Sequence, residues 1–317
     1  MTDTQKIPLI AVVGPTASGK TSLGIELAKK YNGEIISADS MQIYKHMDIA
    51  TAKPTADEMQ GIPHHLIGFL PPDSPFSVAE YTALAKKKIW DIHSRGKLPI
   101  IVGGTGLYVS SLLNNIQFSQ SSSDEALREE LFDIADKKGA DALLEMLADF
   151  DPDSAKRLSE QKNVKRIIRA IEIYKTTGIT MTESLESSRI ADEPYKAVRI
   201  GLRAQDRQFL YDRINKRVDI MLNDGLLEET RKIMDLNLGK TAKMAIGYKE
   251  LIPYFEGDIS LDSAVEKLKM ETRRYAKRQL TWFRRDEKIS WIDIDKLSNC
   301  DIIRAACDIV EGSGIFD

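Results

Sequence analysis

Short apolar runs alternate with amphipathic stretches along the first third of the chain. Ile7–Val13 is an apolar run that ends in a glycine-rich loop, and residues 18–31 carry apolar side chains at helical spacing. Residues 34–37 and 98–102 are further apolar runs of strand length, and residues 78–95 again have a helical pattern. Alternating strands and helices of this kind predict an α/β fold, in which a doubly wound, mostly parallel sheet is flanked by helices.

The pattern changes near residue 117. Residues 117–124 are polar and rich in serine, which is typical of a linker, and from residue 125 to about residue 188 charged helical patterns replace strands. Asp124 can cap the first of these helices, and Pro152 can begin another one. We therefore predict a helical insertion domain at residues 119–191, within a core formed by residues 1–118 and 192–317.

The last third returns to strands and long helices. Residues 198–202 and 289–294 are strand candidates, and residues 206–234 and 261–285 each predict one long helix. Eight lysines and arginines against two acids occupy residues 265–285, interleaved with three aromatic residues, Tyr275, Trp282 and Phe283. This combination suits contact with nucleic acid through phosphate pairing and base stacking. The aromatic residues fit a buried helix stripe equally well.

The composition is that of an ordinary globular protein. The chain has 317 residues, of which 42% are hydrophobic and 29% charged, and its net charge of −3 does not by itself indicate nucleic-acid binding. Two cysteines, Cys300 and Cys307, are too few for a disulfide scaffold. There is no signal-peptide stretch at residues 1–6 and no apolar run of membrane-spanning length. We expect a cytoplasmic protein without membrane contact.

The strongest chemical signal follows the first apolar run. The motif G-x-x-x-x-G-K-[ST] is matched without exception, after a strand and before a helix, as a P-loop requires. Backbone N–H groups and the helix N-terminus can cradle phosphate oxygens, the lysine adds a mobile charge, and the threonine hydroxyl can ligate Mg²⁺. The predicted phosphate-binding residues are Gly14, Pro15, Thr16, Ala17, Ser18, Gly19, Lys20 and Thr21.

Asp39 follows the predicted strand at residues 34–37. In a doubly wound sheet, ligands bind outside the carboxyl ends of the strands, so the P-loop, Asp39 and Thr105 can share one edge. A carboxylate at that edge can serve as a metal ligand or as a general base, although a turn or cap aspartate is the simpler alternative. The usual ATP or GTP enzyme would need a second acidic residue for its metal, which Asp39 could supply, and no guanine-reading N-K-x-D motif occurs.

Three weaker patterns remain open between a functional and a structural interpretation. Gly103-Gly-Thr-Gly-Leu-Tyr108 permits either close approach to a ligand or a tight strand-to-helix turn. His64 and His65 lie in a proline-flanked segment that we expect to be a loop, with packing or substrate contact favoured over catalysis. Arg213 and Arg217 share one side of a predicted helix, where they form either a solvated ion-pair face or cations that reach the phosphates.

Together these segments closely resemble the tRNA dimethylallyltransferases, also called tRNA isopentenyltransferases. The resemblance covers nearly the whole chain, and the order and spacing of the motifs carry it. Besides the P-loop, these motifs are Asp39-Ser-Met-Gln-Ile-Tyr44, Met47-Asp-Ile-Ala-Thr-Ala-Lys-Pro54, Pro63-His-His-Leu66, Gly103-Gly-Thr-Gly-Leu-Tyr108, Ile246-Gly-Tyr248 and Ala276-Lys-Arg-Gln-Leu-Thr-Trp-Phe283.

The resemblance implies transfer of a dimethylallyl group from dimethylallyl diphosphate to N6 of adenine 37 in tRNAs that read codons beginning with U. The P-loop would then hold the diphosphate leaving group rather than ATP, with Mg²⁺ on Thr21. Asp39 would be the general base, Thr105 would bond near the transferred group or the target base, and Arg217 would stabilise the diphosphate.

The resemblance also implies a set of tRNA contacts. The insertion would close on the anticodon stem-loop, and we expect the chain to act as a monomer. The residues that would touch tRNA are Asp39, Ser40, Met41, Gln42, Thr105, Arg128, Lys165, Arg166, Arg169, Met244, Gly247, Tyr248 and Lys249.

Two other functions account for part of the pattern. A P-loop kinase acting on a small molecule or nucleotide explains residues 14–21 and Asp39, but not the basic, aromatic C-terminal helix. A non-catalytic RNA-binding module explains the basic helices and leaves the P-loop without a role. Phosphoryl transfer to a metabolite would favour the first, and tRNA binding that survives Lys20→Ala without product formation would favour the second.

Overall fold

The computed structural model describes residues 6–116, 124–190 and 193–316. The chain forms two compact units, Met1–Leu113 with Pro194–Asp317, and Asn114–Glu193. The predicted linker lies outside the described residues apart from Asp124, as do the predicted domain boundaries at residues 118–119 and 191–192. No helix in the described ranges combines the length and the apolar character needed to cross a lipid bilayer.

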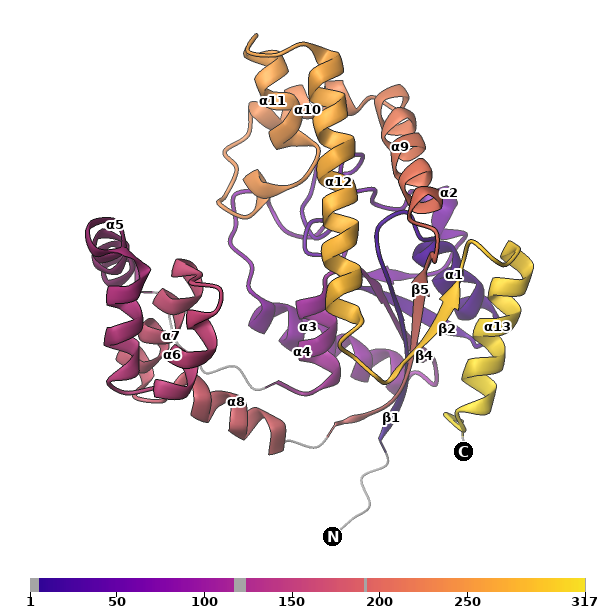
Figure 1. The fold of residues 1–317 in the computed structure, drawn as a ribbon. Helices are drawn as coiled ribbons and strands as arrows, with labels where there is room; N and C mark the ends of the chain where they lie inside the picture. Colours follow the sequence, from indigo (N-terminus) through magenta and orange to yellow (C-terminus); the bar gives the residue numbers. More distant parts are fainter. Residues whose placement is uncertain (1–5, 117–123, 191–192, 317) are drawn as a thin grey trace. The chain divides into compact units, whose positions relative to one another are not determined.

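A six-stranded sheet forms the centre of the first unit (Figure 1). Its strand order is β3-β2-β4-β1-β5-β6, and all neighbouring strands among the described residues pair in parallel. The predicted α/β, mostly parallel architecture is therefore confirmed. The strands are β1 (Ile7–Val13), β2 (Gly33–Ser37), β3 (His64–His65), β4 (Leu98–Gly103), β5 (Tyr195–Arg203) and β6 (Ile289–Asp293).

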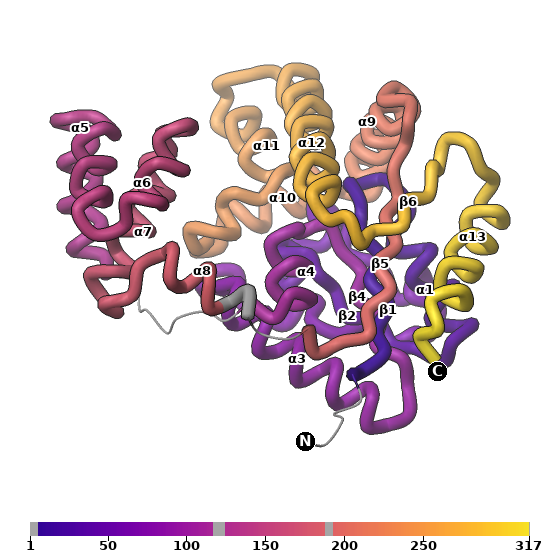
Figure 2. Tube along the Cα trace, turned by 60° about the horizontal axis from the view of Figure 1, so that its bottom comes forward, coloured from indigo at the N-terminus to yellow at the C-terminus, as the bar shows by residue number. Residues whose placement is uncertain are grey.

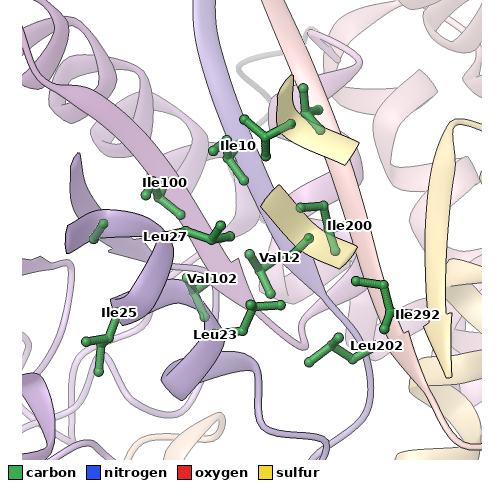
Figure 3. Close-up of a cluster of buried hydrophobic side chains, with 14 of the residues drawn as sticks. Ile10, Val12, Leu23, Ile25, Leu27, Ile100, Val102, Ile200, Leu202 and Ile292 are labelled. Carbon is green, nitrogen blue, oxygen red and sulfur yellow. The ribbon is translucent and has the colours of Figure 1, made fainter. Parts of the chain in front are cut away.

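Helices cover both faces of this sheet. On one face, α1 (Lys20–Lys30) and α13 (Asn299–Gly312) enclose a core in which Ile10 and Val12 of β1 are buried (Figure 3). On the other face, α3 (Val78–Ser94) and α4 (Gly106–Leu113) pack against the alternate β1 residues. Because successive strand residues point to opposite faces, a fully apolar β1 is what a strand covered on both sides requires.

A group of helices follows β5 and lies beyond the carboxyl ends of the strands (Figure 2). It contains α9 (Arg207–Asn223), α10 (Leu226–Met234), α11 (Tyr248–Phe255) and α12 (Leu261–Phe283), and the chain also has the short α2 (Ala56–Met59) and a 3₁₀ turn, Ala242–Met244. The prediction of one helix over residues 206–234 is wrong. The chain breaks at Gly225, whose φ of 100° lies in the left-handed region that favours glycine.

The second unit is helical and is described by itself. It contains α5 (Glu125–Ala148), which is interrupted at Gly139, then α6 (Pro152–Ser159), α7 (Val164–Thr177) and α8 (Met181–Ile190). The side chains of Asp124, Asp151 and Asn163 accept hydrogen bonds from the first turns of α5, α6 and α7. Asp124 and Pro152 thus begin helices where the sequence predicts.

The two adjacent histidines form a short edge strand instead of the predicted loop. β3 pairs with β2, and His65 Nε2 lies 2.7 Å from the carboxylate of Glu34. Glu34 is only 2% exposed and also accepts hydrogen bonds from Arg95 and Lys97 at 2.6–2.8 Å. The Arg95 hydrogen bond is the main cause that holds the pKa of Glu34 well below its usual range. This ion cluster secures the beginning of β2, whose other end leads to Asp39.

We expect Glu34→Gln to lower the free energy of unfolding by about 2 kcal/mol at pH 7, because the variant removes the buried carboxylate charge that pairs with Arg95 and Lys97. Since the folded-state pKa is depressed, this contribution is complete above the unfolded pKa of about 4.3 and declines as the pH falls below it. Urea unfolding at pH 7 and pH 3 measures both effects. Glu26→Gln, which removes a half-exposed pair with Lys29, should change stability by less than about 0.5 kcal/mol. Equal losses in the two variants would contradict this role for Glu34.

Candidate active site

A pocket of about 330 Å³ opens at the carboxyl ends of β1, β2 and β4. The loops after these strands contribute Lys20, Asp39 and Gly104 to its lining, as expected from their shared sheet edge. Helices α9 and α12 contribute further lining residues, as do residues 50–54 and 244–249. Segments that lie far apart in the sequence therefore meet around one cavity of the first unit.

The P-loop has the conformation that an anion cradle needs. Gly14 has a φ of 144°, and a Cβ there would lie 2.5 Å from the carbonyl oxygen of Leu202, so only glycine fits. Gly19, with a φ of 93°, forms the N-cap of α1 and directs the helix N-terminus toward the pocket side of the loop. The Ser18 hydroxyl is buried in this loop and has no hydrogen-bond partner among the described residues, which leaves it available to a ligand.

Two cations are held close to each other at the P-loop. Lys20 Nζ donates a 2.6 Å hydrogen bond to the carbonyl of Pro15, and burial, together with the nearby charge of Arg217, lowers the pKa of Lys20 to about 7. Burial likewise lowers the pKa of Arg217. A bound polyphosphate would relieve this repulsion, so the chemistry of this end of the pocket suits an anion.

The paired arginines of α9 both face the P-loop. Arg213 Nε donates to the carbonyl of Ala17 at 2.8 Å, and Arg217 approaches the hydroxyl of Thr16 at 3.4 Å. In the described part of the chain neither arginine forms an ion pair with an acid, although Arg213 is exposed, and both contact the P-loop.

Asp39 is oriented by the turn that follows β2. Its Oδ1 accepts hydrogen bonds from the backbone N–H groups of Met41 at 2.9 Å and Gln42 at 3.3 Å, which is an Asx turn. Across the described residues, its second carboxylate oxygen has no hydrogen-bond partner, and Asp39 lines the pocket. The turn and the functional interpretation are thus compatible, since one oxygen fixes the side chain and the other remains accessible.

Thr105 supports this turn. Its hydroxyl oxygen accepts a hydrogen bond from Ser40 N–H at 3.0 Å and lies 3.3 Å from the Ser40 hydroxyl. Ser40, Met41 and Gln42 line the pocket, whereas Thr105 is not among its lining residues in the described chain. The glycine segment is also a strand-to-helix turn, because β4 ends at Gly103 and α4 begins at Gly106.

Gln42 is engaged within the protein. Its side-chain amide donates to the carbonyls of Thr51 at 3.2 Å and Ala52 at 3.0 Å, and its oxygen accepts from the Ser37 hydroxyl. These bonds hold the segment at residues 50–54 against the end of β2. His64 also lines the pocket, and burial lowers the pKa of its imidazole.

Gln279 is a site residue to which the sequence analysis assigns no role. Its side chain is 5% exposed, accepts a hydrogen bond from Thr16 N–H at 2.8 Å, and donates to the carbonyl of Gly104 at 3.0 Å. It therefore joins the P-loop to the loop after β4. The helical spacing of Tyr275, Gln279 and Phe283 is the signal that could have indicated a common inward face.

The aromatic residues of α12 divide between the two roles considered for them. Phe283 is buried in the core, and Trp282 Nε1 donates to the Ser110 hydroxyl at 3.0 Å. Tyr275 lines the pocket together with Arg278, and burial, with the nearby Asp39 carboxylate, raises the pKa of its hydroxyl. One helix thus supplies both packing and pocket surface.

The segment at residues 244–249 forms part of the pocket wall. Met244, Gly247 and Lys249 line the pocket, and Met244 is 61% exposed. Tyr248 is completely buried and its hydroxyl donates to Glu229 at 2.7 Å, so its side chain supports the wall from inside the fold.

Comparison with known proteins agrees with this arrangement. The family model described as IPP transferase matches residues 42–286. A tRNA dimethylallyltransferase of Thermoanaerobacter is 49% identical over 92% of this chain and 94% of its own length. The crystal structure of the full-length tRNA isopentenylpyrophosphate transferase from Bacillus halodurans superposes with a TM-score of 0.72, at 42% identity and 98% coverage of both chains. A crystal structure described as a eukaryotic dimethylallyltransferase acting on tRNA superposes with a TM-score of 0.80. The two proteins are 30% identical, and the match covers 96% of this chain and 79% of the other.

This chain belongs to the IPP transferase family, the family of the tRNA dimethylallyltransferases. The resemblance stated from the motifs is confirmed, and with it membership in a family of prenyltransferase enzymes. The segment matched by the IPP transferase model begins at Gln42, and both Gln42 and Gln279 within it line the pocket.

The helical unit of this IPP transferase holds the remaining predicted tRNA contacts. Arg128 and Arg169 pair with the buried carboxylate of Glu172 at 2.8 Å and 2.6 Å. Lys165 and Arg166 are exposed at the start of α7. The four cations therefore differ, since two anchor the fold of their own unit and two face solvent.

The described residues contain no group of three or more His, Cys, Asp or Glu side chains that could bind a metal by themselves. Of the P-loop residues with a hydroxyl, Thr16 and Thr21 line the pocket, and the Ser18 hydroxyl is buried without a partner among the described residues. This donor set fits Mg²⁺ carried mainly by substrate phosphate oxygens, the usual mode for that ion.

The lowered pKa of Lys20 predicts a pH dependence of diphosphate binding in this IPP transferase. Inorganic diphosphate needs the charged amine, so its affinity should fall above pH 7 faster than ionisation of the ligand explains, by up to about tenfold per pH unit. Calorimetric titrations between pH 6 and pH 9 measure this. Lys20→Arg keeps its charge throughout that range and should lack the extra fall. If diphosphate affinity had the same pH dependence in both proteins, titration of Lys20 would not be the cause of the extra fall.

Proposed function

We propose that this protein transfers a dimethylallyl group from dimethylallyl diphosphate to N6 of adenine 37 in tRNAs that read codons beginning with U, giving N6-(dimethylallyl)adenosine. The observation that carries the proposal is a single pocket with two chemically different parts. Lys20, Thr16 and Arg217 lie together at one part of its lining, and Val218, Met221, Leu226 and Leu268, which belong to one apolar cluster, form another. A polar anion site that continues into an apolar surface suits a prenyl diphosphate.

The names of the relatives support the same reaction. Those above 45% identity are tRNA dimethylallyltransferases, and the eukaryotic neighbour is described as acting on tRNA. A small-molecule kinase accounts for the P-loop but for neither the apolar half of the pocket nor these relatives.

Asp39 is the general base in this proposal. The exocyclic amine of adenine is a weak nucleophile because its lone pair is delocalised into the ring. The accessible carboxylate oxygen of Asp39 accepts a hydrogen bond from the amine and orients its lone pair toward C1 of the donor. The N6–C1 bond forms, the C1–O bond to the diphosphate breaks, and the N6 proton passes to the Asp39 carboxylate.

The P-loop end stabilises the leaving group. Negative charge develops on the diphosphate as the C1–O bond breaks, and Lys20, Arg217 and the loop amides are positioned for that charge. Mg²⁺, held by Thr21 and the diphosphate oxygens, would supply further charge neutralisation when bound. Because Lys20 and Arg217 are desolvated, their interaction with the departing anion is stronger than it would be in water.

The tRNA part of the proposal assigns the target base to the pocket and the anticodon stem-loop to the helical insertion. A base must leave its stack to reach an enclosed pocket, as in other base-modifying enzymes. Ser40, Met41, Gln42, Met244, Gly247 and Lys249 would surround it, with Thr105 and Tyr248 holding the walls. Arg128, Lys165, Arg166 and Arg169 would contact the stem. We further propose that the chain acts as a monomer in the cytoplasm.

The test combines purified protein, Mg²⁺ and an unmodified tRNA transcript that carries A37, with either dimethylallyl diphosphate or ATP. We expect mass spectrometry of the digested tRNA to detect dimethylallyladenosine with the prenyl donor and no product with ATP. A transcript with G37 should stay unmodified. Absence of product from the A37 transcript would refute the proposed reaction.

In the same assay, Asp39→Asn should lower kcat by about 100-fold or more, because an amide cannot accept the N6 proton. Asp57→Asn, which changes an exposed carboxyl on α2 outside the pocket, is the matched control and should retain the wild-type rate. Full turnover by the Asp39 variant would exclude its role as the base.

A further inference from the structure

The side chain of Glu229, on α10, binds the backbone of a segment at the pocket wall, residues 48–50. Its Oε2 accepts hydrogen bonds from the N–H groups of Asp48 at 2.9 Å and Ile49 at 2.8 Å. Its Oε1 accepts from Ala50 N–H at 3.0 Å and from the Tyr248 hydroxyl at 2.7 Å. One carboxylate therefore satisfies three consecutive backbone donors and one side-chain donor.

The three backbone hydrogen bonds to this carboxylate hold residues 48–50 more firmly than bonds between neutral groups would. Hydrogen bonds to an ionised carboxylate are about twice as strong as those between neutral groups. Successive N–H groups that converge on one anion form a concave nest, whose shape depends on the anion. Residues 48–50 lie outside any helix or strand, and the Glu229 carboxylate binds their three N–H groups to α10, while Ile49 and Ala50 also pack on the neighbouring apolar cluster.

The clamped segment and its neighbour form one wall of the pocket. Ala50 and Gly247 both line it, and a Cβ on Gly247 would lie 2.7 Å from the Ala50 Cβ, so Gly247 packs closely against the Ala50 side chain. Oε1 of Glu229 bonds to both segments, to one through Ala50 N–H and to the other through the residue after Gly247, Tyr248. Oε1 of Glu229 thus links the two segments of this wall, while Oε2 and the Gln42 side chain hold the first of them at further points.

This wall lies away from the phosphate end. On α9, Arg217 approaches the P-loop, whereas Gly225, just after α9 ends, lies beside Ile49, whose Cδ1 is 3.9 Å from the position of a Gly225 Cβ. The helix from Arg217 to Asn223 alone spans roughly 9 Å. The exposed Met244 adjoins the same wall.

We propose that Glu229 is a positioning residue for the tRNA substrate, an inference that rests on the proposed function. It fixes the Ala50–Gly247 wall against which the target nucleotide is held, and it contacts neither the donor nor the reacting atoms. Loss of its charge should therefore impair use of tRNA and spare diphosphate binding at the P-loop.

The test is Glu229→Gln, with Glu228→Gln as the matched control. Both glutamates lie in the first turn of α10, and Glu228 is exposed. A glutamine can keep one acceptor oxygen but turns an NH₂ group toward N–H donors that need an acceptor. We expect kcat/KM for tRNA to fall about tenfold or more in Glu229→Gln, while Kd for inorganic diphosphate, which needs only the P-loop end, stays within about twofold of wild type. Glu228→Gln should match wild type in both.

Two further measurements separate positioning from general damage to the fold. Amide hydrogen exchange at residues 48–50 should accelerate in Glu229→Gln, while exchange in β1 and β4 stays as in wild type. Tyr248→Phe, which removes one donor to Oε1, should lower kcat/KM for tRNA by a smaller factor, and the double variant should be no worse than Glu229→Gln alone.

The outcomes are distinct. Unchanged tRNA kinetics in Glu229→Gln, or additive losses in the double variant, would overturn the inference and leave the proposed function intact. Parallel loss of diphosphate binding would also overturn it, because the effect would then not be confined to the wall. Failure of the wild-type protein to modify A37 would instead refute the proposed function.

Discussion

The parallel pairing of β1 with both β4 and β5 is the constraint on which the site depends. A central strand must be apolar on both faces and must satisfy its backbone through its neighbours, which fixes its register along Ile7–Val13. The chain then leaves the sheet at Gly14, pressed against the carbonyl of Leu202 on β5, where no side chain fits. This close contact sets the path of the P-loop and the start of α1. The same edge receives the ends of β2 and β4, so Asp39 and Gly104 reach the same pocket.

Helix α12 couples this edge to the rest of the pocket. Ala276 and Phe283 are buried in the core, while Tyr275 and Gln279 reach the cavity from the same helix. Gln279 uses both ends of its amide, one on the P-loop and one on the loop after β4. Since a helix is rigid over such a length, packing of its buried face also fixes the spacing of these loops. Basic residues of this segment, such as Lys277 and Arg284, lie outside that packed face and are exposed.

Charged groups take two different parts in this molecule. Glu34, Glu229 and Glu172 are carboxylates whose acceptor capacity is filled by cations or backbone amides, so they stabilise one arrangement of the chain. Lys20 and Arg217 are in the opposite situation, because burial disfavours both charges, Arg217 disfavours that of Lys20 and Arg213 disfavours that of Arg217. Favourable electrostatics thus hold the scaffold, and a polyphosphate at the P-loop would relieve the unfavourable electrostatics there.

Local pattern was sufficient for much of the fold. Apolar periodicity predicted β1, β4, α1 and α3 to within a residue or two, and capping chemistry located the starts of α5 and α6, because these features depend on neighbours in the sequence. Local pattern gave the wrong element where a single residue ends a helix or where a distant strand makes a segment pair. A helical pattern over residues 206–234 does not reveal the turn at Gly225, and two histidines form a strand only because β2 offers an edge.

The same division holds for the site. The P-loop and its place on a sheet edge are written in the sequence, because the motif itself specifies the backbone shape that binds phosphate. Whether Arg213 and Arg217 face solvent or the P-loop depended on how α9 packs, and whether Tyr248 meets a ligand or the core depended on Glu229, nineteen residues earlier. Spacing along one element determines which residues share a face. Only tertiary packing decides what that face meets, because the partners come from elements that the sequence does not bring together.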